Sequence, residues 1–211
     1  MGPLTKIVFV GLACLVILFG ALGIRACSRT VFHRPQHSGA AQEEAVRETA
    51  DPILAVSNLT DFNKLTTLDP KTRAVNPRIK KTLYWLYVSE KQGIGAIETL
   101  EKAFRMNGNI NSPKSNDSKK QMVANFLEAK AMGLFTADRL SLLKRGQAVS
   151  IATGQYAGEL VEIDHIVPLS RYPEFANDLR NLQLLSFSQN RSKGDRIGTV
   201  EFEKLRELQK P

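Results

Sequence analysis

The chain has 211 residues, of which 43% are hydrophobic and 24% are charged, and its formal net charge is +8. This composition is typical of a globular protein and excludes a mainly disordered chain. The only cysteines are Cys14 and Cys27, so a disulfide or a cysteine-ligated zinc site in the rest of the chain is excluded. The positive charge favours a polyanionic partner only modestly, because many soluble proteins are equally basic.

Residues 1–27 contain an uncharged apolar segment, IVFVGLACLVILFGALGI, at positions 7–24. A helix of this length nearly crosses a bilayer, and Lys6 and Arg25 flank it. The pattern predicts a transmembrane signal anchor, with a cleaved signal peptide as the alternative. Because a very short N-terminal tail usually stays inside, we expect the body outside the cytoplasm, periplasmic or extracellular, and secreted if the segment is cleaved.

Two regions of different composition follow the apolar segment. Residues 28–50 are rich in Ser, Arg, His, Pro, Gly, Gln and Glu, which predicts a flexible linker. Residues 51–146 show the apolar spacing of amphipathic helices. We expect helices around residues 76–90, 94–104, 119–133 and 136–146, the first of them starting at Asn76-Pro77. The turn-forming residues 107–118 are expected to interrupt the helical pattern.

The pattern changes after Gly146, and residues 147–211 form a separate predicted domain. AVSIATG (148–154) and ELVEIDHIV (159–167) predict a hairpin or two short strands, and NLQLLS (181–186) predicts another strand. A helix is expected to start at Ser186, which has capping-box spacing to Gln189, and an amphipathic helix covers residues 200–210. The predicted fold class is α+β, a mostly helical region followed by a small unit of strands and a helix.

Polar residues gather at the end of the expected strand and on the helix that follows it. Asp164 and His165 are adjacent, and Asn190 can meet them if the helix packs against the strands. A carboxylate and an amide oxygen are hard ligands suited to Mg²⁺ or Mn²⁺, and a neutral imidazole can deprotonate an attacking water. One metal ion and one general base suffice for a phosphodiesterase. The alternative for Asp164 and His165 by themselves is an ordinary strand end with a salt bridge.

Residues 162–195 carry three elements in a fixed order, which are Asp-His-Ile-x-Pro at 164–168, Asn-Leu at 181–182 and Asn-x-x-Lys-Gly at 190–194. In this combination the segment resembles the HNH (ββα-metal) endonucleases, in the variant with Asp-His first and Asn last. Nothing comparable occurs in residues 28–150. A ββα-metal unit is therefore expected within residues 147–211.

The resemblance implies a role for each matching residue. Asp164 and Asn190 would bind the metal, and His165 would be the general base. Asn181 joins the predicted catalytic set because it would hold the loop between the strands and so orient His165. Lys193 would approach the phosphate.

The sequence departs from common family forms in two ways. It lacks the cysteine pairs that hold zinc in many HNH proteins, so no structural zinc is expected. It has Asn190 where colicin-type nucleases have histidine, which favours Mg²⁺, with Mn²⁺ as the alternative. Phosphate contacts are further predicted for three arginines, with solvated surface positions as the alternative: Arg180, Arg191 and Arg196.

Glu162 is predicted to contact the metal ligands rather than the metal, and to hold a ligand water or Lys193. The alternative is a solvated position on the strand. The predicted function is a metal-dependent HNH endonuclease acting on nucleic acid, with DNA favoured over RNA. Little sequence preference is expected, because no zinc finger or helix-turn-helix accompanies the motif. The alternative is a membrane-tethered nucleic-acid-binding or interaction protein whose HNH unit is inactive. The sequence indicates no particular protein partner.

Overall fold

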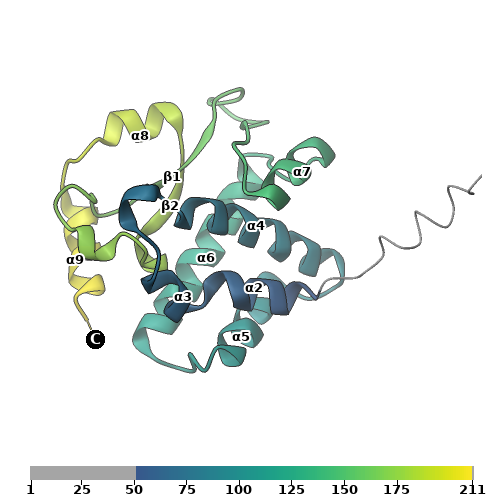
Figure 1. The fold of residues 1–211 in the computed structure, drawn as a ribbon. Helices are drawn as coiled ribbons and strands as arrows, with labels where there is room; N and C mark the ends of the chain where they lie inside the picture. The colour runs from purple at the N-terminus through teal and green to yellow at the C-terminus, as the bar shows by residue number, and fades with distance from the viewer. Residues whose placement is uncertain (1–50, 211) are drawn as a thin grey trace, which may run out of the picture. The chain divides into compact units, whose positions relative to one another are not determined.

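The computed structural model describes residues 51–210, and their N-terminal part is helical (Figure 1). The predicted anchor at residues 7–24 and the predicted linker at 28–50 lie outside the described residues and stay predictions. The helical elements before the first strand are α2 (Pro52–Thr60), α3 (Phe62–Thr66), η1 (Pro70–Thr72), α4 (Val75–Lys91), α5 (Ala96–Met106), α6 (Pro113–Ala131) and α7 (Ala137–Arg145). Within the described residues, no helix is long and apolar enough to cross a bilayer.

Local signals explain where several of these helices start and stop. Ser112 accepts a hydrogen bond from the Ser115 backbone N–H and caps α6, so part of the stretch predicted as turn is helical. Gly146 ends α7 in the left-handed conformation, with φ of 70°. A Cβ atom there would lie 2.9 Å from Pro77, so both the backbone angle and the close approach require glycine.

The start of α4 differs from the prediction. The helix begins at Val75 after Ala74, with no side-chain cap, and Asn76 does not act as the cap. Its side-chain Nδ2 instead donates to the carbonyl oxygen of Ile163 at 3.4 Å. A residue chosen as a local helix signal therefore contacts the distant strand.

The second part of the described chain is a ββα unit followed by a closing helix. Strands β1 (Val161–His165) and β2 (Leu182–Ser186) pair antiparallel, with His165 opposite Leu182. The remaining elements are η2 (Pro173–Phe175), η3 (Leu179–Asn181), α8 (Phe187–Lys193) and α9 (Thr199–Leu208). The predicted capping box of Ser186 and Gln189 starts α8. Residues 148–154 do not form a regular strand, but they pair with the following segment as a short hairpin. Around the bridge between Ser150 and Leu160, the Ile151 N–H donates to the Glu159 carbonyl oxygen at 2.8 Å and the Val161 N–H donates to the Val149 carbonyl oxygen at 2.9 Å.

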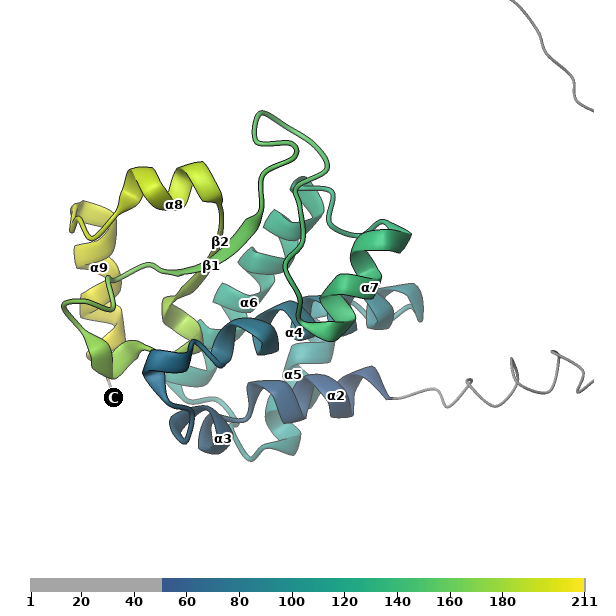
Figure 2. The ribbon, with the colours of Figure 1, turned by 45° about the horizontal axis from the view of Figure 1, so that its top comes forward.

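One hydrophobic core joins the helices to the sheet. It includes Leu83 of α4, Phe126 of α6, Ile163 of β1 and Leu184 of β2. The sheet lies between α8 on one side and α4 and α6 on the other (Figure 2). The buried Asn125 on α6 adds a 2.9 Å hydrogen bond from Nδ2 to the Leu182 carbonyl oxygen. The predicted boundary after residue 146 thus separates two sequence patterns that share a core.

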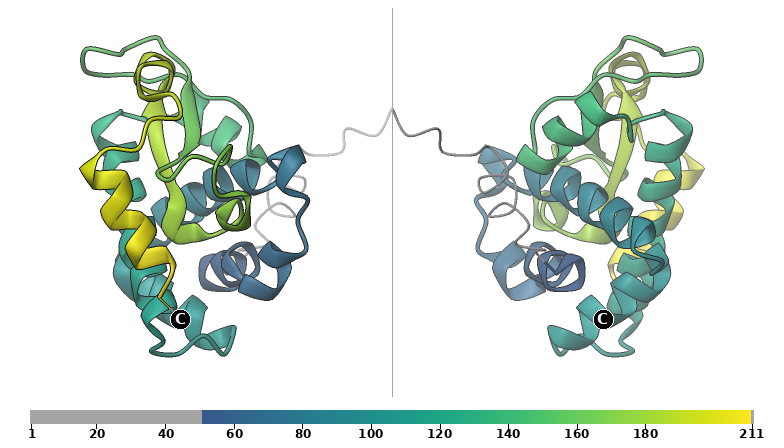
Figure 3. Two further views of the ribbon diagram at one scale, coloured as in Figure 1. Left: turned by 90° about the vertical axis from the view of Figure 1, so that its left-hand side faces the viewer. Right: turned by 90° about the vertical axis from the view of Figure 1, so that its right-hand side faces the viewer.

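A smaller cluster attaches the C-terminal helix. Leu205 and Leu208 of α9 pack with Val167, next to η3 and apart from α2 (Figure 3).

Tyr84, Trp85 and Tyr87 on α4 are partly buried against the main core. The predicted α+β fold class is confirmed, with a mostly helical region and one small two-stranded sheet.

Candidate active site

A cavity of about 440 Å³ lies where β1 ends beside α8. Its wall brings together the acid, the histidine and the asparagine that the sequence singled out, because α8 packs against both strands. The polar side chains on the wall are Arg73, Glu162, Asp164, His165, Asn190 and Arg191. The cavity therefore combines candidate metal ligands, a titratable imidazole and two guanidinium groups.

His165 is held in one tautomer by the protein. The residue is 9% exposed, and its Nε2 lies 2.9 Å from the carbonyl oxygen of Ala176. A carbonyl oxygen only accepts hydrogen bonds, so Nε2 carries the hydrogen. In the neutral ring Nδ1 then keeps its lone pair as a proton acceptor.

The surroundings of His165 favour the neutral ring. Burial lowers its pKa below the ordinary value, and the hydrogen bond to Ala176 and the charge of Asp164 raise it in opposition. The positive charges of Arg73 and Lys193 lower the pKa further, and the net direction is downward. An imidazole that is neutral near pH 7 is the form that a general base requires.

Asn181 fixes the loop that follows His165. It is fully buried, and its side-chain Oδ1 accepts a 2.7 Å hydrogen bond from the Val167 N–H. Its Nδ2 donates to the carbonyl oxygens of Val167 at 3.1 Å and Phe175 at 3.4 Å. Phe175 precedes Ala176, so Asn181 holds both the segment after His165 and the segment whose carbonyl holds the imidazole. This placement fits the predicted orienting role, exercised without lining the cavity.

Asp164 points toward α8 and is paired there. Its Oδ2 lies 3.1 Å from Lys193 Nζ and accepts a hydrogen bond from Gln183 Nε2 at 3.3 Å. Lys193 also donates from Nζ to the His165 carbonyl oxygen at 2.7 Å. Lys193 therefore contacts the protein at the end of β1, and its predicted contact with phosphate stays a prediction.

Glu162 positions Asn190. The Asn190 Nδ2 donates to Glu162 Oε2, so the amide oxygen Oδ1, on the other side of the same planar group, remains the ligand atom. Of the two partners predicted for Glu162, Lys193 pairs with Asp164 instead, and the ligand water stays a prediction. Burial lowers the pKa of Lys80 on α4, and the charge of Glu162 opposes that shift.

Residues 150–199 match the family model for HNH endonucleases. The match contains β1, β2 and α8, and therefore Asp164, His165, Asn181 and Asn190. Comparisons with curated proteins and with solved structures gave no match. The HNH match indicates nuclease activity in general, nucleic acid as the substrate class and a divalent metal as the cofactor class.

The donor set of the HNH unit fits a hard divalent metal. A carboxylate from Asp164 and an amide oxygen from Asn190 stand on one cavity wall. Across residues 51–210, no three His, Cys, Asp or Glu side chains gather into a metal-binding group. Mg²⁺ is commonly held by one or two protein oxygen ligands, with water and phosphate oxygens in the remaining positions.

The three predicted phosphate-binding arginines have different positions. Arg191 lines the cavity, and its guanidinium lies 4.9 Å from the ring centre of the exposed Phe187. The phosphate contact predicted for Arg180 is wrong, because this residue is 3% exposed and its guanidinium pairs with Asp178 at 2.8 Å. Its guanidinium also donates to the carbonyl oxygens of Glu207 and Leu208 at the C-terminal end of α9. Arg180 therefore satisfies the last carbonyl groups of that helix.

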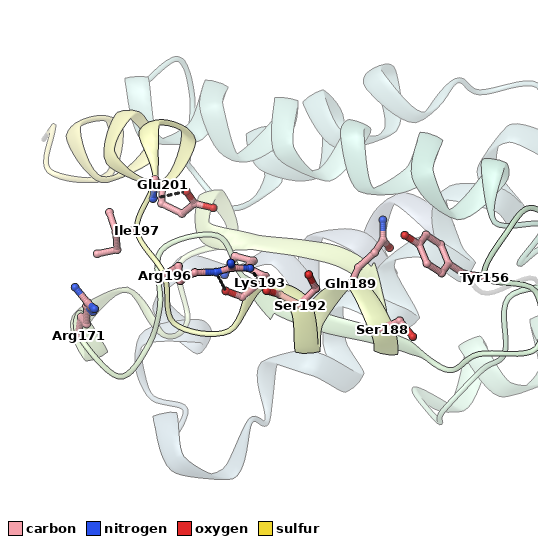
Figure 4. A pocket seen from close by; sticks show the side chains of 10 residues that line it. Tyr156, Arg171, Ser188, Gln189, Ser192, Lys193, Arg196, Ile197 and Glu201 are labelled. Carbon is pink, nitrogen blue, oxygen red and sulfur yellow. Dashed lines mark hydrogen bonds between the residues drawn. The ribbon is translucent and has the colours of Figure 1, made fainter.

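Arg196 lines a second depression of the HNH unit, away from the cavity. Its Nε donates to the Lys193 carbonyl oxygen at 3.1 Å at the end of α8. This groove has a volume of about 920 Å³ and runs along α8, from Arg171 at one end to Tyr156 at the other (Figure 4). Cations and an aromatic ring in one groove are typical of nucleic-acid contacts, and neither Arg171 nor Tyr156 belongs to the motif.

The sequence also gave no signal for Arg73. This residue follows η1, about ninety positions before the ββα unit and outside the HNH match, yet it lines the same cavity as His165. No short-range motif connects the two segments. Only the packing of the helical region against the sheet brings them together.

Proposed function

We propose that this chain is a metal-dependent endonuclease that hydrolyses phosphodiester bonds, with DNA as its preferred substrate and little sequence preference. The observation that carries the proposal is that Asp164, His165 and Asn190 line one cavity while Nε2 of His165 is held by a carbonyl oxygen. The three residue types that the proposed chemistry needs, a carboxylate, an imidazole and an amide, thus line the same cavity.

The hydrolysis needs a water oxygen to attack phosphorus while the bond to the departing oxygen breaks. His165 Nδ1 takes the proton of the attacking water, and the Ala176 carbonyl stabilises the imidazolium that forms by accepting from Nε2–H. A positioned general base of this kind contributes roughly 10²–10⁴-fold in rate. The hydroxide oxygen thus forms the new bond to phosphorus as the bond to the departing oxygen breaks. The departing oxygen takes a proton from solvent water and leaves as an alcohol, and the proton on His165 returns to solvent.

A divalent ion bound by Asp164 and Asn190 would supply charge stabilisation at the scissile phosphate and the departing oxygen. The protein keeps both ligand side chains in place for that ion. Glu162 accepts from the amide nitrogen of Asn190 and so directs its oxygen, and Gln183 donates to Asp164. These contacts hold two candidate ligands from different elements, β1 and α8, at the wall of one cavity.

The proposal is tested by incubating the purified full-length chain, in mild detergent, with plasmid DNA and with RNA. We expect cleavage in Mg²⁺ or Mn²⁺ and none in EDTA. Asp164→Ala and Asn190→Ala should each abolish cleavage or shift it to much higher metal concentration. The matched controls Asp138→Ala and Asn63→Ala alter exposed residues of the helical region and should cleave normally.

Three outcomes decide between the hypotheses. Cleavage that proceeds in EDTA, or that survives both ligand substitutions, contradicts the metal mechanism. A chain that binds nucleic acid but cleaves none of it with any divalent metal is the inactive binding protein, and the nuclease proposal then fails. Cleavage of RNA in preference to DNA overturns the substrate preference and leaves the reaction standing.

A further inference from the structure

One wall of the active-site cavity comes from the helical region rather than from the ββα unit. Arg73 is the first residue after η1, and its backbone is left-handed, with φ of 52° and ψ of 32°. Residues other than Gly, Asn and Asp rarely adopt this conformation. The fold therefore holds an arginine in an unfavourable backbone state at the edge of the cavity that contains His165.

Hydrogen bonds tie the turn that carries Arg73 to both halves of the active site. Before the turn, the Leu68 carbonyl oxygen accepts a 2.8 Å hydrogen bond from Asn177 Nδ2, next to the Ala176 carbonyl that holds His165. After the turn, Asn76 Nδ2 donates to the Ile163 carbonyl oxygen of β1 at 3.4 Å. The backbone of Arg73 itself accepts from the Asn76 N–H at 3.0 Å. These contacts set the turn against β1 and against the loop that holds the imidazole.

The charge of Arg73 is not matched by a protein acid. The structure of residues 51–210 records no ion pair for Arg73, whereas Asp164 pairs with Lys193 and Glu162 accepts from Asn190. A guanidinium presents several N–H donors in a planar fork that matches the oxygens of a phosphate.

We propose that Arg73 binds the scissile phosphate in this cavity, so that the helical region completes the active site of the ββα unit. The inference rests on the proposed nuclease function and names a residue that contacts its substrate. Arg73 would donate to a non-bridging oxygen, where negative charge builds up as water attacks. Such a contact is stronger in the transition state than with the bound substrate, so its loss lowers kcat more than it raises KM.

The test compares Arg73→Gly and Arg73→Lys with the parent chain. Glycine suits the left-handed backbone, so Arg73→Gly should melt no lower than the parent while its cleavage falls about 10²-fold. Lysine keeps the charge without the fork and should recover only part of the rate. Half-maximal Mg²⁺ should not change, because Arg73 is not a ligand. Arg105→Ala, at an exposed position of α5, is the matched control and should cleave normally.

Nucleic-acid binding gives a second readout that does not depend on turnover. In a His165→Ala background, adding Arg73→Gly should lower the slope of log affinity against log salt by about 1. A folded Arg73→Gly chain that cleaves at the parent rate overturns this inference alone, and so does an unchanged salt slope. A parent chain that cleaves nothing overturns the proposed function instead, so the two failures are distinguishable.

Discussion

The two halves of the described chain contribute to the cavity in different ways. In residues 147–210, the side chains proposed to carry out the chemistry lie within 27 positions of one another, between Asp164 and Asn190. In residues 51–146, Arg73 before α4 lines the cavity, whereas Asn76 on α4 and Asn125 on α6 hold the two strands through hydrogen bonds outside it. The proposed metal ligands and general base thus come from one compact motif, whereas Arg73 and the contacts that place the motif come from long-range packing.

This difference teaches that the ββα unit is not an independent module in this protein. A two-stranded sheet is marginal by itself and needs further packing to be stable. Here that packing is the shared core of helices and strands. Substitutions in each half should therefore separate effects on the chemistry from effects on the stability of the fold.

Asn181→Ala should affect both chemistry and stability. The change removes one acceptor and two donor contacts at a fully buried position, and leaves the Val167 N–H without its partner. We expect the free energy of unfolding to fall by about 3 kcal/mol, measured by urea denaturation, and cleavage to fall even at temperatures where the variant is folded. A folded variant with unchanged cleavage would show that Asn181 does not orient His165.

Asn125→Ala should lower the stability of the fold without changing the chemistry. It removes the hydrogen bond to the Leu182 carbonyl at a buried site, which should lower the free energy of unfolding by about 2 kcal/mol. Since Asn125 lies outside the cavity, cleavage well below the melting temperature should match the parent. A large loss of kcat in the folded variant would mean that the two halves are coupled more closely than we propose.

The pH dependence of cleavage tests the imidazole directly. Only neutral His165 accepts the proton, and burial places its folded pKa below the reference value of 6.5. Cleavage should therefore hold from neutral pH down to about 6.5 and then fall roughly tenfold per pH unit below the folded pKa. A single-turnover profile in constant Mg²⁺ measures this limb. An acid limb centred above pH 7 would contradict the lowered pKa.

Arg171→Ala should have the smallest effect. Arg171 is exposed in the large groove beside α8 and does not line the cavity. We expect the salt dependence of nucleic-acid binding to weaken by a slope of about 1, with cleavage at low salt changed by no more than about twofold. Unchanged binding at every salt concentration would show that the groove does not follow the substrate backbone.

The sequence predicted what depends on short-range pattern. Alternating residues identified β1, and the spacing of Ser186 to Gln189 identified the start of α8. Asp164, His165 and Asn190 then indicated a site, because together with Asn181 and Lys193 they resemble the motif of the HNH endonucleases.

Other features could not be read from local pattern. The β-branched stretch at 148–154 looks like a full strand, yet its pairing with the next segment is limited to a bridge at Ser150 and Leu160 and the backbone hydrogen bonds beside it. Arg180 resembles a phosphate contact in sequence, but Asp178 two residues earlier and the end of α9 satisfy its donors. Arg73 gave no signal, since its partners in the cavity lie about ninety positions away.

The role of His165 as general base is tested by measuring cleavage by His165→Ala with and without added imidazole. We expect the substitution to lower the cleavage rate roughly 10²–10⁴-fold. In Mg²⁺ and above the pKa of imidazole, added imidazole should enter the vacated space and restore part of the rate. Metal-ligand variants such as Asp164→Ala should show no such recovery. A folded His165→Ala chain that cleaves at the parent rate without imidazole would contradict the account.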